Sequence, residues 1–137
     1  VKADDLDALI LPGGFGAAKN LCTFALDGVK MKVNPEVERL LRAMSLARKP
    51  LGLICIAPVI GAKVLAELGP RLTIGNDPDT AAAMNALGAQ HVDCAVDQIV
   101  VDEKNRIAST PAYMLGPTIA PVAAGIEKLV AAVLEMA

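Results

Sequence analysis

Short apolar runs alternate with amphipathic segments along this chain. Residues 7–11 and 51–55 are apolar runs of strand length, and each leads into small or turn-forming residues. Asn34-Pro35 is a good helix start, and apolar side chains recur at helical spacing after it. Residues 29–33 alternate strictly, which predicts a short strand or arm. Strands alternating with helices predict an α/β fold with a mainly parallel sheet.

The second half of the chain continues this alternation and adds a hairpin. A helix follows residue 55 and ends at Gly69-Pro70, and a shorter one over 81–87 is capped by the Asp77–Thr80 segment. Residues 98–110 read as a β-hairpin with a polar tip, whose acidic residues serve the turn. A long helix closes the chain. Helical spacing predicts which apolar residues face inward. In the helix after residue 55 these are Ile60, Val64, Leu65 and Leu68. In the last helix they are Ile119, Val122, Ile126, Leu129, Val130, Val133 and Leu134.

Composition narrows the class of protein. The 137 residues suit one domain, 1–137, and a chain with 54% hydrophobic but only 2% aromatic residues must build its core from aliphatic side chains. A net charge of -2 without a long basic run argues against nucleic acid as a partner. The longest apolar run, 51–62, is too short to span a membrane. Three widely spaced cysteines predict reduced thiols and a cytoplasmic location, and no Cys/His spacing predicts a metal site.

Cys55 is the first candidate for chemistry. It ends the apolar run 51–55, and small residues and a proline follow, which predicts a sharp turn between a strand and a helix. A thiol placed there lies at the carboxyl edge of the sheet, under the positive end of a helix that favours the thiolate. A buried packing cysteine is the alternative, because free cysteine is among the most buried residue types. Spacing alone leaves both interpretations open.

The glycine turn at Gly13-Gly14 is the second candidate. If the strands over 7–11 and 51–55 are parallel neighbours, their carboxyl ends bring the Gly14 amide near Cys55. The amides of Gly14 and Ile56 would then form an oxyanion hole beside the thiol. A phosphate-binding loop is the competing function, but the third glycine of the dinucleotide motif is missing and no GK[ST] follows. A tight turn that needs glycine for its backbone is compatible with the oxyanion hole.

The remaining candidates are weaker. His91 is the only histidine, and its pKa near neutrality suits acid–base work, but nothing in the spacing requires it to lie near Cys55. A structural role is therefore favoured. Cys22 and Cys94 lack the setting of Cys55 and are expected to be core or surface thiols.

Three motifs follow one another along the chain: LILPGGFGAAKNL from residue 9, PLGLICIAP from residue 50 and TPAYM from residue 110. Together they resemble the PfpI superfamily, and within it the ElbB (enhancing lycopene biosynthesis) branch. The resemblance implies a flavodoxin-like three-layer sandwich, class I glutamine-amidotransferase-like, usually a homodimer. It also implies Cys55 as nucleophile with the amides of Gly14 and Ile56, and a cofactor-free glyoxalase III activity that converts small dicarbonyl substrates to hydroxy acids. Tyr113 would line the pocket.

The sequence departs from the family pattern in two respects. Many relatives have a histidine directly after the cysteine, where this chain has Ile56. Relatives without it are expected to orient the thiol with a glutamate from a first strand and helix, a region that these 137 residues lack. We therefore expect the domain to be N-terminally incomplete and its general acid or base to lie in that region. Two other functions stay open: a non-catalytic redox-sensing or regulatory protein, and a glutamine amidase subunit, which the missing histidine disfavours.

Overall fold

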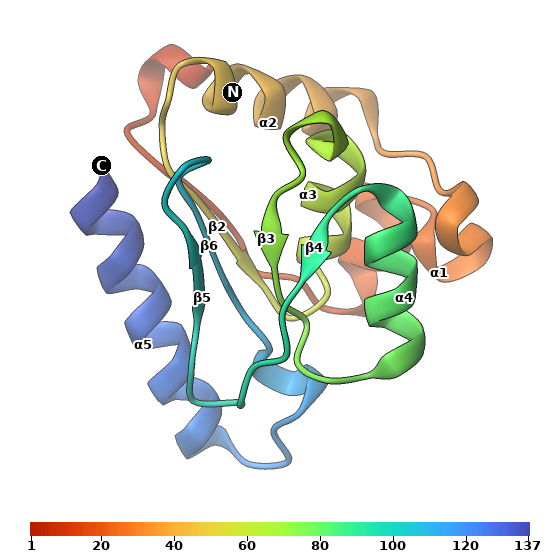
Figure 1. Cartoon of the computed structure of the whole chain (residues 1–137). Coiled ribbons are helices and arrows are strands. Elements are labelled where there is room, and N and C mark those ends of the chain that lie inside the picture. Colours follow the sequence, from red (N-terminus) through yellow and green to blue (C-terminus); the bar gives the residue numbers. More distant parts are fainter.

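The structure, a computed structural model, describes residues 1–137 as a central sheet between two layers of helices (Figure 1). The sheet has the order β1-β2-β6-β5. The pairs β1–β2 and β2–β6 are parallel, and β5 and β6 are the antiparallel hairpin expected from the sequence. The predicted α/β, flavodoxin-like fold with a mainly parallel sheet is confirmed. The strands are β1 Leu9–Leu11, β2 Leu51–Ile54, β5 Val100–Asp102 and β6 Ile107–Thr110.

Helices cover both faces of this sheet. The helices α2 (Pro35–Leu46) and α3 (Pro58–Val64) pack on one face, and α4 (Pro78–Leu87) packs against α3. The long α5 (Ile119–Met136) lies on the other face. A small parallel sheet joins β3 to β4 beside the main one. The remaining elements are β3 Arg71–Leu72, β4 Gln90–His91, α1 Phe24–Asp27, a π-helical turn Ala17–Leu21, and 3-10 turns Ala3–Asp5, Gly28–Lys30, Ala66–Leu68 and Ala112–Met114.

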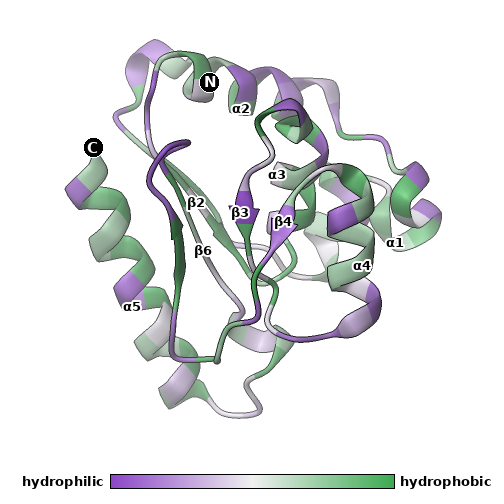
Figure 2. Ribbon diagram, viewed as in Figure 1, coloured by the Kyte–Doolittle hydropathy of each residue, from purple (hydrophilic) through white to green (hydrophobic).

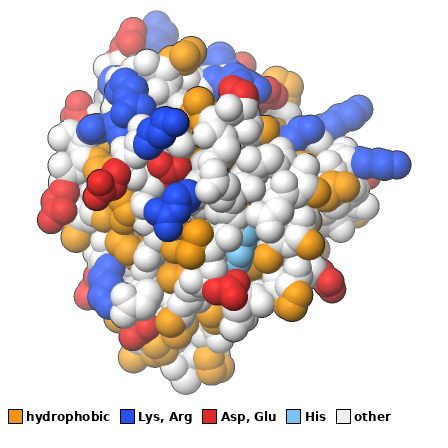
Figure 3. Space-filling view, viewed as in Figure 1, with side chains coloured by type: hydrophobic (Ala, Val, Ile, Leu, Met, Phe, Trp, Pro, Cys, Tyr) orange, Lys and Arg blue, Asp and Glu red, His pale blue; other side chains and the backbone are white.

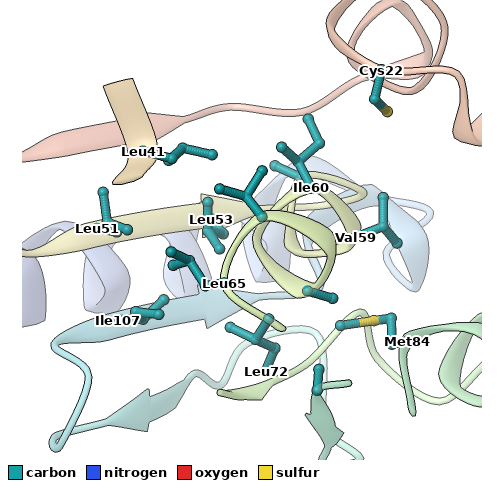
Figure 4. Packing of buried hydrophobic residues seen from close by; sticks show 14 of the residues in the cluster. Cys22, Leu41, Leu51, Leu53, Val59, Ile60, Leu65, Leu72, Met84 and Ile107 are labelled. Atoms are coloured by element: carbon teal, nitrogen blue, oxygen red, sulfur yellow. The ribbon is translucent and has the colours of Figure 1, made fainter. Parts of the chain in front are cut away.

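The core has one apolar cluster on each side of the sheet. Leu51 and Leu53 of β2 belong to the cluster beneath α2 and α3 (Figure 4). Ile54 belongs to the cluster beneath α5. All four residues of β2 are buried, and its ribbon is mostly in the green of hydrophobic residues in Figure 2. At Gly52 an added Cβ would lie 2.9 Å from Leu129 of α5, so glycine lets this helix approach the sheet closely. No aromatic residue is among the buried residues. The aliphatic core predicted from composition is confirmed.

The helix boundaries follow the predicted capping residues. The Asn34 side chain accepts hydrogen bonds from the amides of Glu36 and Val37 at 2.9 and 3.3 Å. Asp77 accepts one from the amide of Thr80 at 2.9 Å, and Gly69 adopts the left-handed conformation, with φ +56°, after the third helix. These interactions satisfy terminal groups that a helix leaves unpaired.

Four local predictions were wrong. Residues 29–33 form a 3-10 turn followed by a single bridge from Val33 to Cys22, not a strand. Leu68 is 40% exposed, because α3 tightens into a 3-10 turn that rotates its last residues outward. Ile119 and Leu134 are 73% and 66% exposed. Ile119 opens α5, and Leu134 lies about 100° around the helix from the buried Val133.

Surface charges of both signs are interspersed on the face shown in Figure 3. Arg42 illustrates the pattern, with its guanidinium 3.2 Å from Glu38 and 2.9 Å from Glu67. The pair with Glu38 is an i,i+4 contact within α2. Exposed pairs of this kind contribute little to stability, so the apolar layers decide the fold. None of the helices combines the length and apolarity that a membrane crossing requires.

Candidate functional site

Cys55 lies on a sharp turn between β2 and α3, as the sequence predicts. Its φ is +63°, a left-handed conformation that costs a non-glycine residue roughly 1–2 kcal/mol. Two backbone hydrogen bonds hold the turn: the Cys55 amide donates to Thr110 of β6 at 3.0 Å, and the Ala57 amide donates to Ile54 at 3.1 Å. The side chain is half-buried. Cys55 is therefore neither a core residue nor a freely exposed thiol.

The glycine turn after β1 packs directly against this cysteine turn. Because Leu11 pairs with Leu53 in parallel register, the residues after both strands emerge at the same edge of the sheet. Gly13 has φ +88°, and a Cβ there would overlap the carbonyl oxygen of Ile54 and lie 3.0 Å from the Cβ of Cys55. Only glycine allows this approach.

The backbone amides of Gly14 and Ile56, the predicted oxyanion donors, have no partner in the chain. Gly14 and Ile56 line one pocket with Cys55, and neither amide donates a hydrogen bond to any group of the protein. The Gly14 carbonyl, in contrast, accepts from the amide of Ala17 at 3.0 Å, which fixes the turn that presents its N–H. The structure thus brings together Cys55, Gly14 and Ile56. Their catalytic roles stay a prediction.

The pocket at Cys55 has a volume of about 330 Å³ and an apolar lining. Apart from the thiol, no lining side chain carries a charge or a hydrogen-bonding group. Sequence reasoning missed Phe24 and Met114 here, although the chain has only two phenylalanines and both line this pocket. Tyr113 is 60% exposed and does not line it, because the 3-10 turn after β6 presents the next residue instead. The lining residues are Gly14, Phe15, Ala18, Phe24, Ala25, Cys55, Ile56 and Met114.

His91 has a structural position. Its side chain is only 2% exposed, and its Nε2 accepts a hydrogen bond from the Ile74 amide at 3.2 Å. The other ring nitrogen is 3.6 Å from the Asp93 carboxylate. Burial lowers the pKa of His91, and Asp93 opposes this in part. His91 does not line the Cys55 pocket.

The other two thiols also have structural surroundings. The buried Cys22 thiol donates to the carbonyls of Ala17 and Ala18 at 3.5 and 3.6 Å, and burial raises its pKa. The half-buried Cys94 thiol donates to the carbonyl of Ala95 at 3.4 Å, and burial raises its pKa as well. Both are core or surface thiols, as expected.

Acidic groups do not gather into a metal site: no three His, Cys, Asp or Glu residues lie close enough together to hold an ion. Asp102 instead ends β5 and accepts hydrogen bonds from the amide and side chain of Asn105 and from the Arg71 amide. Burial alone would raise the pKa of Asp102, but these hydrogen bonds lower it overall. The hairpin carboxylate serves the turn, as predicted.

The site thus combines a three-layer α/β fold with a cysteine on a left-handed strand-to-helix turn. The human protein "Glutamine amidotransferase-like class 1 domain-containing protein 3, mitochondrial" is 46% identical over 99% of this chain, which covers 53% of that protein. The Ehrlichia chaffeensis "isoprenoid biosynthesis protein with amidotransferase-like domain" superposes with a TM-score of 0.88 at 31% identity, over 99% of this chain and 62% of that one.

A more distant neighbour, Drosophila melanogaster DJ-1β, has a TM-score of 0.56 at 24% identity, over 98% of this chain and 63% of that one. It supports the fold alone. No family model matches the chain. The chain is therefore similar in sequence to a glutamine amidotransferase-like class 1 domain protein, and DJ-1β shares its fold. The chain spans about half the length of the curated relatives it matches.

The comparisons overturn the predicted cytoplasmic location. Similar proteins from Rattus norvegicus, Homo sapiens and Danio rerio are all named as mitochondrial. Unpaired cysteines led to the error, because they indicate a reducing environment but do not distinguish one reducing compartment from another.

Proposed function

We propose that this protein is a cofactor-free enzyme of the glyoxalase III type, in which Cys55 converts small dicarbonyls to hydroxy acids. The observation that carries the proposal is the meeting of the Cys55 turn with two unpartnered amides, those of Gly14 and Ile56, at one pocket. Nucleophile and oxyanion donors are the elements that addition to a carbonyl requires. The Ehrlichia chaffeensis neighbour, described as an isoprenoid biosynthesis protein, supports placing the chain in the ElbB branch.

The proposed reaction begins with addition of the Cys55 thiolate to the aldehyde carbon. The carbon–sulfur bond forms, and the electron pair of the carbonyl moves to its oxygen, which the amides of Gly14 and Ile56 stabilise. A base then removes the proton from this carbon, and the adjacent carbonyl carbon gains one. The first oxygen re-forms its double bond to carbon and the second oxygen takes up a proton, which gives a thioester of the hydroxy acid. Water cleaves the thioester and restores the thiol.

The proton transfer needs a group that the pocket does not provide. Cys55 is the only titratable residue among those that line it. We assign the transfer to a carboxylate from outside the pocket lining, or to water, which every cycle already requires as a reactant.

The test is loss of methylglyoxal and formation of lactate, with no cofactor added. The Cys55→Ser variant should lose the activity, whereas Cys94→Ser, which changes the other half-buried thiol, should keep it. Equal rates for Cys55→Ser and the parent protein would contradict the proposal.

Redox sensing is the second candidate function. A half-buried thiol in a pocket without a base favours it, since such a thiol can be oxidised without turnover. Peptide mass spectrometry after peroxide treatment should then find sulfenic or sulfinic acid at Cys55 and not at Cys22 or Cys94. Uniform oxidation of the three, or none, would contradict this alternative. Homodimer formation also stays a prediction, and sedimentation analysis would test it.

A further inference from the structure

The aromatic residues of this chain are distributed in an unusual way. The 137 residues include two phenylalanines, one tyrosine and no tryptophan. None of the three is fully buried, although Phe24 packs against the larger core cluster, and both phenylalanines line the Cys55 pocket. Aromatic rings normally supply much of the buried apolar area of a core. Here the fully buried core is aliphatic, and both phenylalanine rings border the pocket.

Phe15 and Phe24 border the pocket in different ways. Phe15 follows the glycine turn and is 74% exposed, so most of its ring contacts water. Phe24 begins α1 and is half-buried. An apolar ligand in the pocket would shield the Phe15 ring from water, which is favourable in proportion to the area covered. The arrangement therefore favours an apolar group beside the thiol.

Charge points to the same conclusion. No cationic side chain lines the pocket, so a carboxylate bound there would lose water without gaining an ionic partner. The amides of Gly14 and Ile56, which donate to no group of the protein, suffice for one carbonyl oxygen. At about 330 Å³ the pocket is at the small end of ligand sites. It suits one short acyl unit with a compact substituent.

We propose that the Cys55 pocket selects carbonyl compounds that carry an uncharged apolar substituent, an alkyl chain or an aromatic ring, and rejects those that carry a carboxylate. This inference rests on the proposed function for the reaction, but the binding preference can be measured without it. The aldehyde carbon bonds to Sγ as described above, with its oxygen at the two amides. The substituent packs against Phe15 and Phe24 and takes no part in bond making.

The first experiment measures how fast Cys55 is alkylated, independently of turnover. N-benzylmaleimide and maleimidoacetate share one reactive group and differ in their substituents. Rates are normalised to those of the unfolded chain. Cys55 should react roughly tenfold to a hundredfold faster with the benzyl reagent, since each buried methylene contributes about fourfold. The ratio should fall towards one in Phe24→Ala. Tyr113→Ala, which changes an aromatic residue outside the pocket, is the matched control and should keep the ratio.

Phe15→Ala is the second variant, because a ring that is 74% exposed can be removed without unfolding the chain. It should also lower the benzyl preference. Equal normalised rates for the two reagents in the parent protein would overturn the inference, as would a preference that survives both Phe15→Ala and Phe24→Ala.

The second experiment compares kcat/KM for glyoxal, methylglyoxal and phenylglyoxal. An increase along this series, reduced in Phe24→Ala, supports the inference. Turnover without any increase overturns it and leaves the proposed function in place. A benzyl preference in alkylation without turnover of any dicarbonyl has the opposite meaning: the apolar site stands, and the proposed function fails.

Discussion

Cys55 has a backbone conformation that its own side chain disfavours, and its neighbours explain why it stays there. The φ of +63° is held by the hydrogen bond to Thr110 and by the close approach of Gly13. Strain of this kind persists only where the surrounding structure determines it, and it is common at functional sites. At the scale of single residues, the site therefore depends on glycine in the first loop as much as on the cysteine.

Gly13 and Gly14 give a matched test of this dependence. Both have φ near +88°, but an added Cβ would meet the Cys55 turn only at Gly13. At Gly14 no other atom lies within 4 Å of an added Cβ. Gly14→Ala should cost about 1–2 kcal/mol from backbone strain alone. Gly13→Ala should cost about 3 kcal/mol or more, because steric overlap is added. Urea unfolding measures both; equal losses would contradict the packing described for Gly13.

His91 predicts a pH dependence of stability. Burial, with Asp93 opposing it in part, lowers the pKa of His91 below its ordinary value of 6.5. As the pH falls, the unfolded chain therefore takes up a proton on His91 before the folded chain does. The contribution of the neutral ring to folding stability is complete above about pH 6.5 and is lost as the pH falls below that value.

In His91→Gln, which keeps a neutral side chain able to accept the Ile74 hydrogen bond, the fall in stability between about pH 7 and about pH 5 should be smaller. Urea midpoints over that range provide the measurement. A slope as steep as in the parent protein would show that other groups cause the loss.

At the scale of elements, the sequence predicted the order and type of most segments but not all their faces. Asn34, Asp77 and Gly69 marked helix ends, because capping depends on residues close in sequence. The inward faces of α3 and α5 were partly wrong, since they depend on where each helix ends and meets the sheet. Leu68 and Leu134 have the right residue type for a core but lie outside it.

The helix α5 offers a direct test of that correction. Leu129 is fully buried against β2, whereas Leu134 is 66% exposed. Leu129→Ala should lower the free energy of unfolding by about 2–5 kcal/mol. Leu134→Ala should change it by about 0.5 kcal/mol or less. Similar losses in the two variants would place Leu134 in a contact that this structure does not contain.

At the scale of the whole molecule, topology assembles a site that no single segment contains. The sequence identified Cys55, Gly14 and Ile56, because adjacent parallel strands end at the same edge of a sheet. It did not identify Phe24 and Met114, which reach the pocket from α1 and from the turn after β6. Such contacts depend on packing between distant elements, and no local pattern encodes them. The apolar character of the pocket emerged only from the structure.

The number of hydroxy acid molecules formed per chain tests the central claim most directly. Proton NMR can count lactate produced from excess methylglyoxal by a known amount of protein, with no cofactor added. An enzyme that turns over through Cys55 should form many lactate molecules per chain, and Cys55→Ser should form none above the uncatalysed background. At most one lactate per chain in the parent protein, or equal formation by Cys55→Ser, would contradict the account.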